Sequence, residues 1–310
     1  MGVLYGTTYK TIGNREGLTD VIADLFMDET PLFSMSEKIN AISTKHEWQE
    51  DTLASASRAG IVEGADLTYA QTAARTRLYN YTQIRLRNWA VSFTQMAVTT
   101  AGIKDDVARE LMKAMKAIAT DYETQLLTTG DRTVGTTAIA RESRGLLKAI
   151  VSNTGYGSGG ASGDAATSQL TEDVINARLQ EIWDAGGNPR ALICGGYQKR
   201  VISKKFSAKT GFTFNIEAST RQAIANINKY EGSFGTIDII PDKFMAQTKR
   251  LAIITPEMIK IAVLRDIKQY KGAPTASTIK GWVEGEMCLQ WGNEKAHAEQ
   301  YSLQNSGAIV

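Results

Sequence analysis

Residues 75–94 read RTRLYNYTQIRLRNWAVSFT, the longest strand-like stretch that the sequence predicts. Near its end the side chains alternate strictly, with Trp89, Val91 and Phe93 on one face, which predicts a half-buried strand. Further back the same face becomes basic, aromatic and polar, in the order Arg77, Tyr79, Tyr81, Gln83, Arg85 and Arg87. A strand lying wholly over its own core would stay apolar along that face, so part of this strand is predicted to leave the core.

The length of the strand supports the same prediction. As one continuous strand, Arg75–Thr94 is about 65 Å long, whereas a compact chain of this size is roughly 50 Å across. Its expected partner is His46–Leu53, which contains Trp48, and the segment Ala54–Ala74, rich in Ala, Gly and Ser, is expected to be a mobile tip. The alternative is two shorter strands, broken by a bulge, in an ordinary sheet.

A long amphipathic helix is predicted over Lys104–Leu127, with a length of about 36 Å. Its apolar side chains recur at spacings of three or four: Val107, Leu111, Met115, Ile118, Tyr122 and Leu126. Thr128 and Gly130 supply the stop. One apolar stripe on a solvated rod predicts a helix that packs on a core along one side.

The remaining chain predicts a mixed α+β layout. A second helix begins at the cap Thr171, with Ile175, Leu179, Ile182 and Trp183 on its apolar face. Further strands are expected at residues 191–194, 237–240, 251–254, 259–264 and 282–291. A glycine- and serine-rich loop is expected over residues 152–167, and a sub-domain from about residue 167 to 254.

Composition sets broad limits on function. The chain has 310 residues, 43% hydrophobic and 22% charged, with a net charge of +2, so there is no bulk electrostatic attraction toward nucleic acid. No apolar run approaches the ~20 residues that a membrane span needs, and residues 1–10 lack a signal-peptide pattern. Cys194 and Cys288 lie in apolar surroundings and are expected to be reduced core thiols of a cytoplasmic protein.

A search for catalytic chemistry finds little. Residues 155–160 match the dinucleotide fingerprint in spacing, but no strand is expected before the match and no helix opens at its end, which favours a loop. His46 and His297 are far apart in the sequence and are expected to be structural. The glycosylation pattern beginning at Asn80 is expected to be accidental. We therefore assign no catalytic, cofactor-binding or metal-binding residue, and no cofactor.

Several motifs, in order along the chain, resemble tailed-bacteriophage major capsid proteins with the Hong Kong phage type of fold. They are GNREGLTDVI at 13–22, DETPLF at 28–33, KHEWQEDTL at 45–53, VEG at 62–64, RLYNYTQ at 77–83 and GEMCLQWGNEKAH at 285–297. The motifs are spread over most of the chain, from residue 13 to residue 297, and their order is more specific than any one of them alone.

The resemblance implies a division of the chain. It implies an N-terminal arm at 1–41, an extended loop with its base strands at 42–103, and a peripheral domain at 104–166 with a spine helix at 104–127. It further implies an axial domain at 167–254 and strands at 255–310 that return to the peripheral domain. The implied function is self-assembly through pentamers and hexamers into an icosahedral head around double-stranded DNA, with the chain assembled in the host cytoplasm.

The implied partners are other copies of the chain, a separate scaffolding protein, a portal, possible decoration proteins and, non-specifically, packaged DNA, with no membrane. Only about 45 residues precede the extended loop, so a large fused scaffolding domain is not expected. Some shells of this fold are welded by an isopeptide bond from a loop lysine. Because no Lys lies between His46 and Ile103, we expect a non-covalent shell.

The expected subunit interface is electrostatic and aromatic, because Arg and Tyr concentrate binding energy at interfaces. Its candidate residues are Arg75, Arg77, Tyr79, Tyr81, Arg85 and Arg87, with Glu47, Glu50 and Asp51. We expect the arginines to meet acidic residues on adjacent subunits. The alternative for this surface is a solvated strand face. For the whole protein, two alternatives remain: a bacterial nanocompartment (encapsulin-like) shell, and a nucleotide-binding enzyme that uses residues 155–160.

Overall fold

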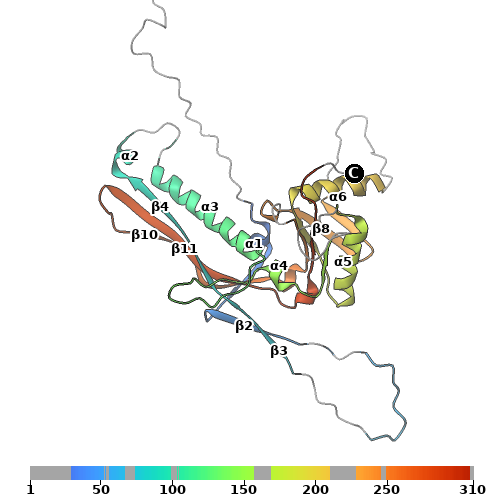
Figure 1. Ribbon diagram of the computed structural model, residues 1–310. Helices are drawn as coiled ribbons and strands as arrows, with labels where there is room; N and C mark the ends of the chain where they lie inside the picture. Colours follow the sequence, from blue (N-terminus) through green and yellow to red (C-terminus); the bar gives the residue numbers. More distant parts are fainter. Residues whose placement is uncertain are drawn as a thin grey trace, which may run out of the picture.

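The computed structural model shows two sheet-based bodies and a long hairpin that projects from the first of them (Figure 1). The structure describes residues 29–51, 53, 56–66, 74–98, 103, 105–156, 169–209, 228–245 and 249–307. Residues 1–28 of the expected N-terminal arm lie outside these residues. The mixture of helices and sheets confirms the α+β class.

The first body is a four-stranded sheet in the order β1-β10-β11-β4. Its strands are β1 (Glu37–Asn40), β10 (Lys260–Lys271), β11 (Thr278–Gln290) and β4 (Gln83–Ser92). β1 runs parallel to β10, and the other pairs are antiparallel. The two C-terminal strands were expected to be shorter, at 259–264 and 282–291. Each extends further because it forms one long ladder with its neighbour.

The stretch at residues 75–94 is divided at Thr82. Before it, β3 (Thr76–Tyr81) pairs antiparallel with β2 (Lys45–Glu50) in a two-stranded sheet, and after it β4 pairs with β11. The expected pairing with the segment at 46–53 is therefore confirmed, but a single continuous strand is wrong. The alternative of two shorter strands in one ordinary sheet is also wrong, because the two halves belong to different sheets.

The end of this stretch also differs from the prediction. Phe93 lies in a short helix, α2 (Phe93–Ala97), and its side chain is exposed. The Ser92 side chain caps that helix by accepting a hydrogen bond from the Gln95 amide at 3.1 Å. A serine at an N-cap thus ends the alternation one residue before Phe93.

The predicted long helix is α3 (Asp106–Leu126), which lies along one face of the first sheet (Figure 1). The Asp105 side chain caps it by accepting from the amides of Val107 and Ala108. Its buried apolar face is Ala114, Ile118, Tyr122 and Leu126. Met115 was placed on this face but is 50% exposed, whereas the neighbouring Ala114 is buried.

The second body is a six-stranded sheet in the order β5-β12-β9-β6-β8-β7. Its strands are β5 (Thr154–Tyr156), β6 (Ala191–Cys194), β7 (Lys229–Gly232), β8 (Gly235–Pro241), β9 (Leu251–Ile254) and β12 (Ala298–Tyr301). β6 and β9 are buried on both faces, as expected of central strands. β12 comes from the segment 255–310 yet lies in this sheet and not in the first.

Two helices, α5 (Glu172–Asp184) and α6 (Gly196–Lys209), accompany this sheet. The predicted cap is confirmed, since the Thr171 hydroxyl accepts from the Val174 amide at 3.4 Å. Trp183 was expected in the core but is 61% exposed and lies near Phe234. Gly155 was expected in a loop, but it lies in β5, where a Cβ would meet the Arg178 side chain.

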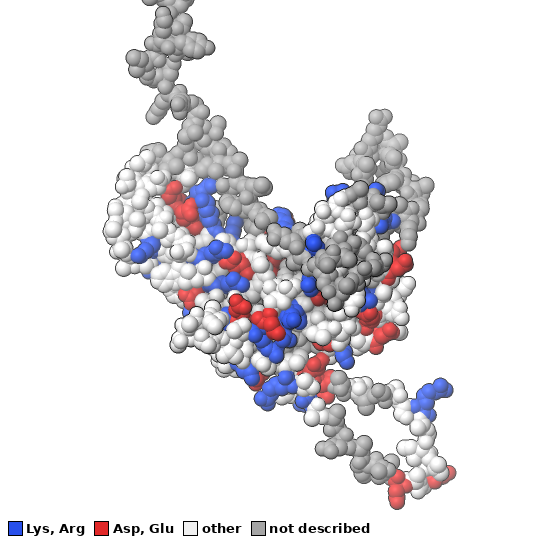
Figure 2. All heavy atoms as spheres, in the orientation of Figure 1, with Lys and Arg blue, Asp and Glu red and all other residues white. Residues whose placement is uncertain are grey.

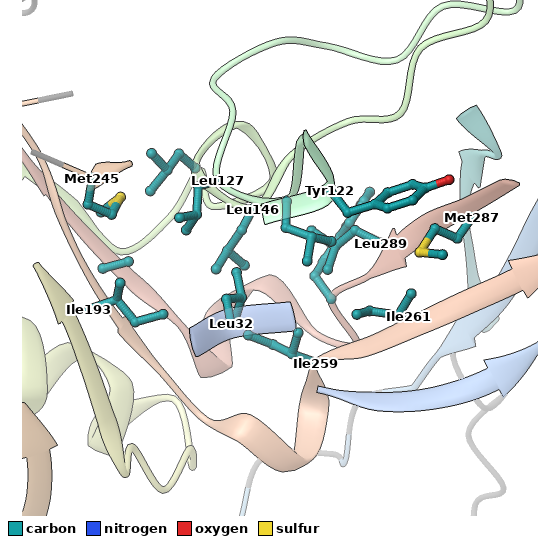
Figure 3. Packing of buried hydrophobic residues seen from close by; sticks show 14 of the residues in the cluster. Leu32, Tyr122, Leu127, Leu146, Ile193, Met245, Ile259, Ile261, Met287 and Leu289 are labelled. Atoms are coloured by element: carbon teal, nitrogen blue, oxygen red, sulfur yellow. The ribbon is translucent and has the colours of Figure 1, made fainter. Parts of the chain in front are cut away.

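One hydrophobic core joins the two bodies. It contains Trp89 and Val283 of the first sheet together with Ile193 and Ile254 of the second. Leu32, from α1 (Pro31–Met35), is fully buried among them (Figure 3). The remaining short elements are α4 (Leu146–Ala149) and 3-10 turns at Pro256–Met258 and Glu294–Ala296.

Candidate subunit-interface surface

The hairpin β2–β3 projects from the body, and its root is held by buried side chains. Asn80 is fully buried. Its Nδ2 donates to Ser143 Oγ, to the Arg144 carbonyl and to the Leu289 carbonyl, at 2.7–3.1 Å. Its Oδ1 accepts from the amides of Tyr81 and Arg144. Asn80 therefore fixes β3 to the first body, and its burial excludes it as a glycan acceptor in the folded chain.

Aromatic packing holds the other strand of the root. Trp48 meets Trp291 edge-on, with ring centroids 4.7 Å apart, and its Nε1 donates to the Gly292 carbonyl at 3.0 Å. The His46 ring lies 2.7 Å from Gln290 Oε1. His46 is thus a hydrogen-bonded structural residue, as expected.

A charged cluster lies where the chain passes from β3 to β4. The Glu286 carboxylate is almost fully buried and accepts from Thr82 Oγ1 at 2.7 Å, from Arg141 Nη2 at 2.6 Å and from Arg265 Nε at 3.0 Å. The three hydrogen bonds to this buried carboxylate offset most of the energy that its desolvation costs. The direction of the hairpin is therefore set by specific polar contacts.

The outer face of the hairpin carries most of the candidate residues. Arg75 Nε lies 3.1 Å from Asp51 Oδ2, and Arg77 Nη1 lies 3.5 Å from Glu47 Oε2. Lys45 also pairs with Glu47, and its hydrogen bond is the main cause that lowers the pKa of that carboxyl. Figure 2 shows both signs of charge gathered where the hairpin leaves the body.

The two tyrosines of the hairpin lie together. Tyr79 and Tyr81 meet edge-on with ring centroids 5.6 Å apart. The Lys45 ammonium and the Arg132 guanidinium lie over the Tyr79 ring, at 4.3 Å and 3.8 Å from its centroid. The charged and aromatic side chains on this side of the hairpin form one surface, which we call the hairpin face. It consists of Lys45, Glu47, Asp51, Arg75, Arg77, Tyr79 and Tyr81.

Arg85 and Arg87 do not belong to the hairpin face. Arg87 forms a two-point ion pair with Asp121 of α3, at 2.5 and 2.6 Å, and Arg85 Nε donates to Gln125 at 3.2 Å. Both side chains lie on the α3 side of the first sheet. In this structure they therefore fasten β4 to α3 within one chain, and their expected contact with a neighbouring subunit stays a prediction.

Glu50 also lies apart from the arginines. Burial, followed by the nearby Glu294 carboxylate, raises the pKa of Glu50. Glu294 accepts from the amides of Val151 and Ser152. Glu50 therefore faces the body beneath the hairpin.

Apolar residues that the sequence reading did not single out are exposed on both sides of the root. Beyond the root, Ile61 and Val62 are 73% and 78% exposed. On β4, Ile84 and Leu86 are each about half exposed, on the face opposite α3. The sequence contains a signal for Ile84 and Leu86. They stand at even positions, whereas the apolar residues of the alternating pattern stand at odd positions from Trp89 onward.

The described residues offer little for catalysis. An open groove of about 670 Å³ is lined by Arg144, Asp131, Arg250 and Glu299, but these charges pair with one another. No group of three potential metal ligands is found among the residues that the structure describes. Burial raises the pKa of both cysteine thiols, Cys194 and Cys288, to about 12, so they are poor nucleophiles.

His297 is buried and structural, as expected. Its Nδ1 accepts from the Thr255 amide at 3.3 Å, and its Nε2 lies 2.9 Å from the Trp291 carbonyl. Burial lowers its pKa to about 4, so the ring is neutral. In the described part of the chain, no helix is long and apolar enough to cross a membrane.

Solved structures with a similar fold are phage capsids and related shells. The chain is 13% identical to a chain of the cyanophage A-1(L) capsid asymmetric unit, covering 94% of this chain and 97% of that one, with a TM-score of 0.70. A chain of Mycobacterium phage Bobi has 14% identity, covers 93% and 95%, and has a TM-score of 0.62. At these identities the similarity shows the fold alone.

A shell that is not a phage capsid is also similar. The SrpI encapsulin of Synechococcus elongatus PCC 7942 is 9% identical, covers 93% of this chain and 94% of that chain, and has a TM-score of 0.57. No curated protein matches the sequence. The family model described as SU10 major capsid protein matches residues 5–301, and the chain therefore belongs to this family of phage major capsid proteins.

Proposed function

We propose that copies of this chain close into an icosahedral phage head of pentamers and hexamers around double-stranded DNA, and that the β2–β3 hairpin holds neighbouring subunits together. The observation that carries the proposal is the hairpin itself. It leaves the first body with charged and aromatic side chains exposed, and a lone two-stranded hairpin is marginally stable in water. A second copy of the chain supplies a surface for it.

The composition of the hairpin face supports this role. Its arginines and tyrosines are side-chain types enriched at interface hot spots. Its ion pairs within the chain are exposed and therefore contribute little to folding. Exchanging these partners for acidic residues of a neighbour costs little, which suits a surface that must rearrange during assembly.

The division of the chain follows the two bodies. We assign the first sheet and α3 to the peripheral domain and the six-stranded sheet with α5 and α6 to the axial domain, which would pack around fivefold and sixfold axes. β12 and β5 are assigned to the axial domain with the sheet they join. A separate scaffolding protein, a portal and decoration proteins complete the assembly, which would take place in the host cytoplasm, and contact with DNA is non-specific.

The shell is proposed to be structural and non-covalent, without catalysis. Negative-stain electron microscopy and light scattering of the purified chain, alone and with a co-expressed scaffolding protein, test the assembly. Closed shells, or rings of five and six, support the proposal, whereas a chain that stays monomeric in both cases contradicts it. Heating the particles in denaturing detergent tests the covalent question, since a ladder of oligomers would contradict a non-covalent shell.

The encapsulin-like alternative rests on the similarity to the SrpI shell. Native particles distinguish it, because a phage head holds DNA and a nanocompartment holds an enzyme. A nucleotide-binding enzyme has less support: Gly155 is packed against Arg178 and Gln300, and α5 begins at Glu172, well after the glycines. A thermal shift with a nucleotide panel would be the observation in its favour.

A further inference from the structure

Two acidic side chains meet in the interior where the two bodies join. Glu123 lies near the C-terminal end of α3 and is fully buried, and Asp242 follows β8 of the second body and is 2% exposed. The Glu123 carboxyl lies within hydrogen-bonding reach of Asp242. Acidic residues are almost never fully buried unless they are paired, so this contact needs a physical explanation.

Each carboxyl also holds backbone amides. Glu123 Oε1 accepts from the Leu32 amide at 2.9 Å, and Oε2 accepts from the Phe33 amide at 2.7 Å, so Glu123 fixes α1 to α3. Asp242 Oδ1 accepts from the Phe244 amide at 2.6 Å. Asp242 Oδ2 is buried and receives no donor from the described residues. If both groups were ionised, two acceptors would face each other with no hydrogen between them.

The surroundings supply no compensating positive charge. Leu32, Leu127, Ile193 and Met245 belong to the hydrophobic core that joins the two bodies (Figure 3). Among the described residues, no Lys, Arg or His forms an ion pair with either carboxyl. Of the other titratable groups nearby, the neutral Cys194 thiol interacts electrostatically with both Asp242 and Lys199. Lys243 pairs with Glu29 ahead of α1.

A proton resolves this arrangement. Burial, and then the contact with Asp242, raises the pKa of Glu123 to about 8, despite the two α1 amides that favour its ionised form. The Glu123 carboxyl therefore keeps its proton over a range in which isolated carboxyls have lost theirs.

We propose that Glu123 and Asp242 share one proton, and that this shared hydrogen bond fastens α1 and α3 to the six-stranded sheet, so that its loss loosens the junction between the two bodies. The hydrogen bond between Glu123 and Asp242 joins three parts of the molecule at one point: α1, the long helix α3 and the second sheet. It lies within one chain, so it acts on each subunit whether or not the subunit is assembled.

The direction of the pH effect follows from the raised pKa of Glu123. Between its ordinary value near 4.5 and about 8, the folded chain holds a proton that the unfolded chain has released. The stability supplied by the shared proton is therefore complete below the lower value and is lost as the pH rises through the upper one. The unfolding equilibrium constant should rise by up to tenfold per pH unit in this range.

Asp242→Asn is the test variant. Its Oδ1 can still accept from the Phe244 amide, and its Nδ2 would donate to Glu123 without a titrating proton. Asp238→Asn is the matched control, because it removes one exposed carboxylate from β8, the strand that Asp242 follows. The full-length chain, kept unassembled, is studied from pH 6 to 9 by urea unfolding and by hydrogen exchange of residues 29–36, corrected for the intrinsic exchange rate.

The expected result is that wild type and Asp238→Asn both lose stability and protection of residues 29–36 as the pH rises, while Asp242→Asn shows a much smaller dependence. A wild type that is indifferent to pH in this range overturns the proposal, as does a pH dependence that Asp242→Asn leaves unchanged. Should Asp242→Asn fail to fold, Glu123→Gln replaces it, because its amide would donate to Asp242 Oδ2 while its oxygen accepts from one α1 amide.

Discussion

β3 and β4 follow each other in the sequence with one residue between them, yet they lie in different surroundings. β4 packs between β11 and α3, with Trp89 and Val91 buried beneath the helix. Among the described strands β3 pairs with β2 alone, and its far end is exposed on both faces. One strand-like stretch is thus divided: its second half contributes to the stability of the subunit, and its first half is the part that we propose contacts other subunits.

The first prediction tests the half that contributes to folding. Trp89→Ala should lower the free energy of unfolding by about 3–5 kcal/mol, because it empties a large buried site between the sheet and α3. Leu86→Ala, in the same strand but on the half-exposed face, is the matched control and should cost roughly 1 kcal/mol or less. Urea unfolding of unassembled subunits measures both. Equal losses would remove the distinction between the faces of β4.

The second prediction concerns the buried His297 ring, which contacts the Trp291 carbonyl. Because burial lowers the pKa of His297 to about 4, the unfolded chain takes up a proton before the folded chain does as the pH falls. The stability that depends on the neutral ring is complete above pH ~6.5 and is lost as the pH falls through about 4, by about 3 kcal/mol.

His297→Gln provides the control for this prediction. A glutamine can accept from the Thr255 amide and donate toward the Trp291 carbonyl without titrating. Unfolding measured between pH 4 and 7 should show a smaller loss for the variant than for wild type. Identical pH profiles would mean that other groups cause the acid sensitivity.

The third prediction concerns the root of the hairpin, where β3 passes into β4. Asn80→Ala should cost about 1–3 kcal/mol, because it leaves buried amide and carbonyl groups of the root without partners. Hydrogen exchange should become faster at Arg144 and along β3, while α3 keeps its protection. Faster exchange throughout the molecule would instead show that Asn80 supports the whole fold.

The fourth prediction, with the smallest effect on stability, separates folding from assembly. Arg75→Glu with Arg77→Glu should change the free energy of unfolding by less than ~0.5 kcal/mol, because both ion pairs are exposed. Assembly, followed by light scattering, should nevertheless fail or slow markedly.

Arg85→Glu with Arg87→Glu is the comparison for this pair. It brings a carboxylate against Asp121 and should destabilise the subunit by about 1 kcal/mol or more. Loss of assembly in this second variant alone would assign the contacts between subunits to β4 and not to the hairpin face.

Much of the fold could be predicted because local patterns and tertiary structure agree. The period of α3, its stop and the Thr171 cap are local signals, and the pairing of β2 with β3 follows from one long strand that needs a partner. The break at Thr82 could not be predicted, because it depends on Glu286 and Arg141, which are distant in the sequence. Trp183 was misplaced as well: its helix position is suitable for burial, but its ring lies near Phe234, between β7 and β8, and stays 61% exposed.

The candidate surface was only partly predictable. Residues at odd positions from 77 to 87 share a face in an unbroken strand, but the separation of β3 from β4 divides them between the hairpin and α3. The pairing of Arg87 with Asp121 depends on how α3 lies across the sheet, which no local pattern states. The Glu123–Asp242 contact was equally hidden, since a carboxylate in a helix ordinarily predicts a solvated position.

The most direct test of the central claim is hydrogen exchange of the full-length chain, compared between unassembled subunits and assembled particles. We expect β2 and β3 to become strongly protected on assembly, whereas the amides of α3 and β4 should be protected to the same degree in both states. A hairpin that exchanges equally fast in subunits and particles would contradict the claim that it holds neighbouring copies together.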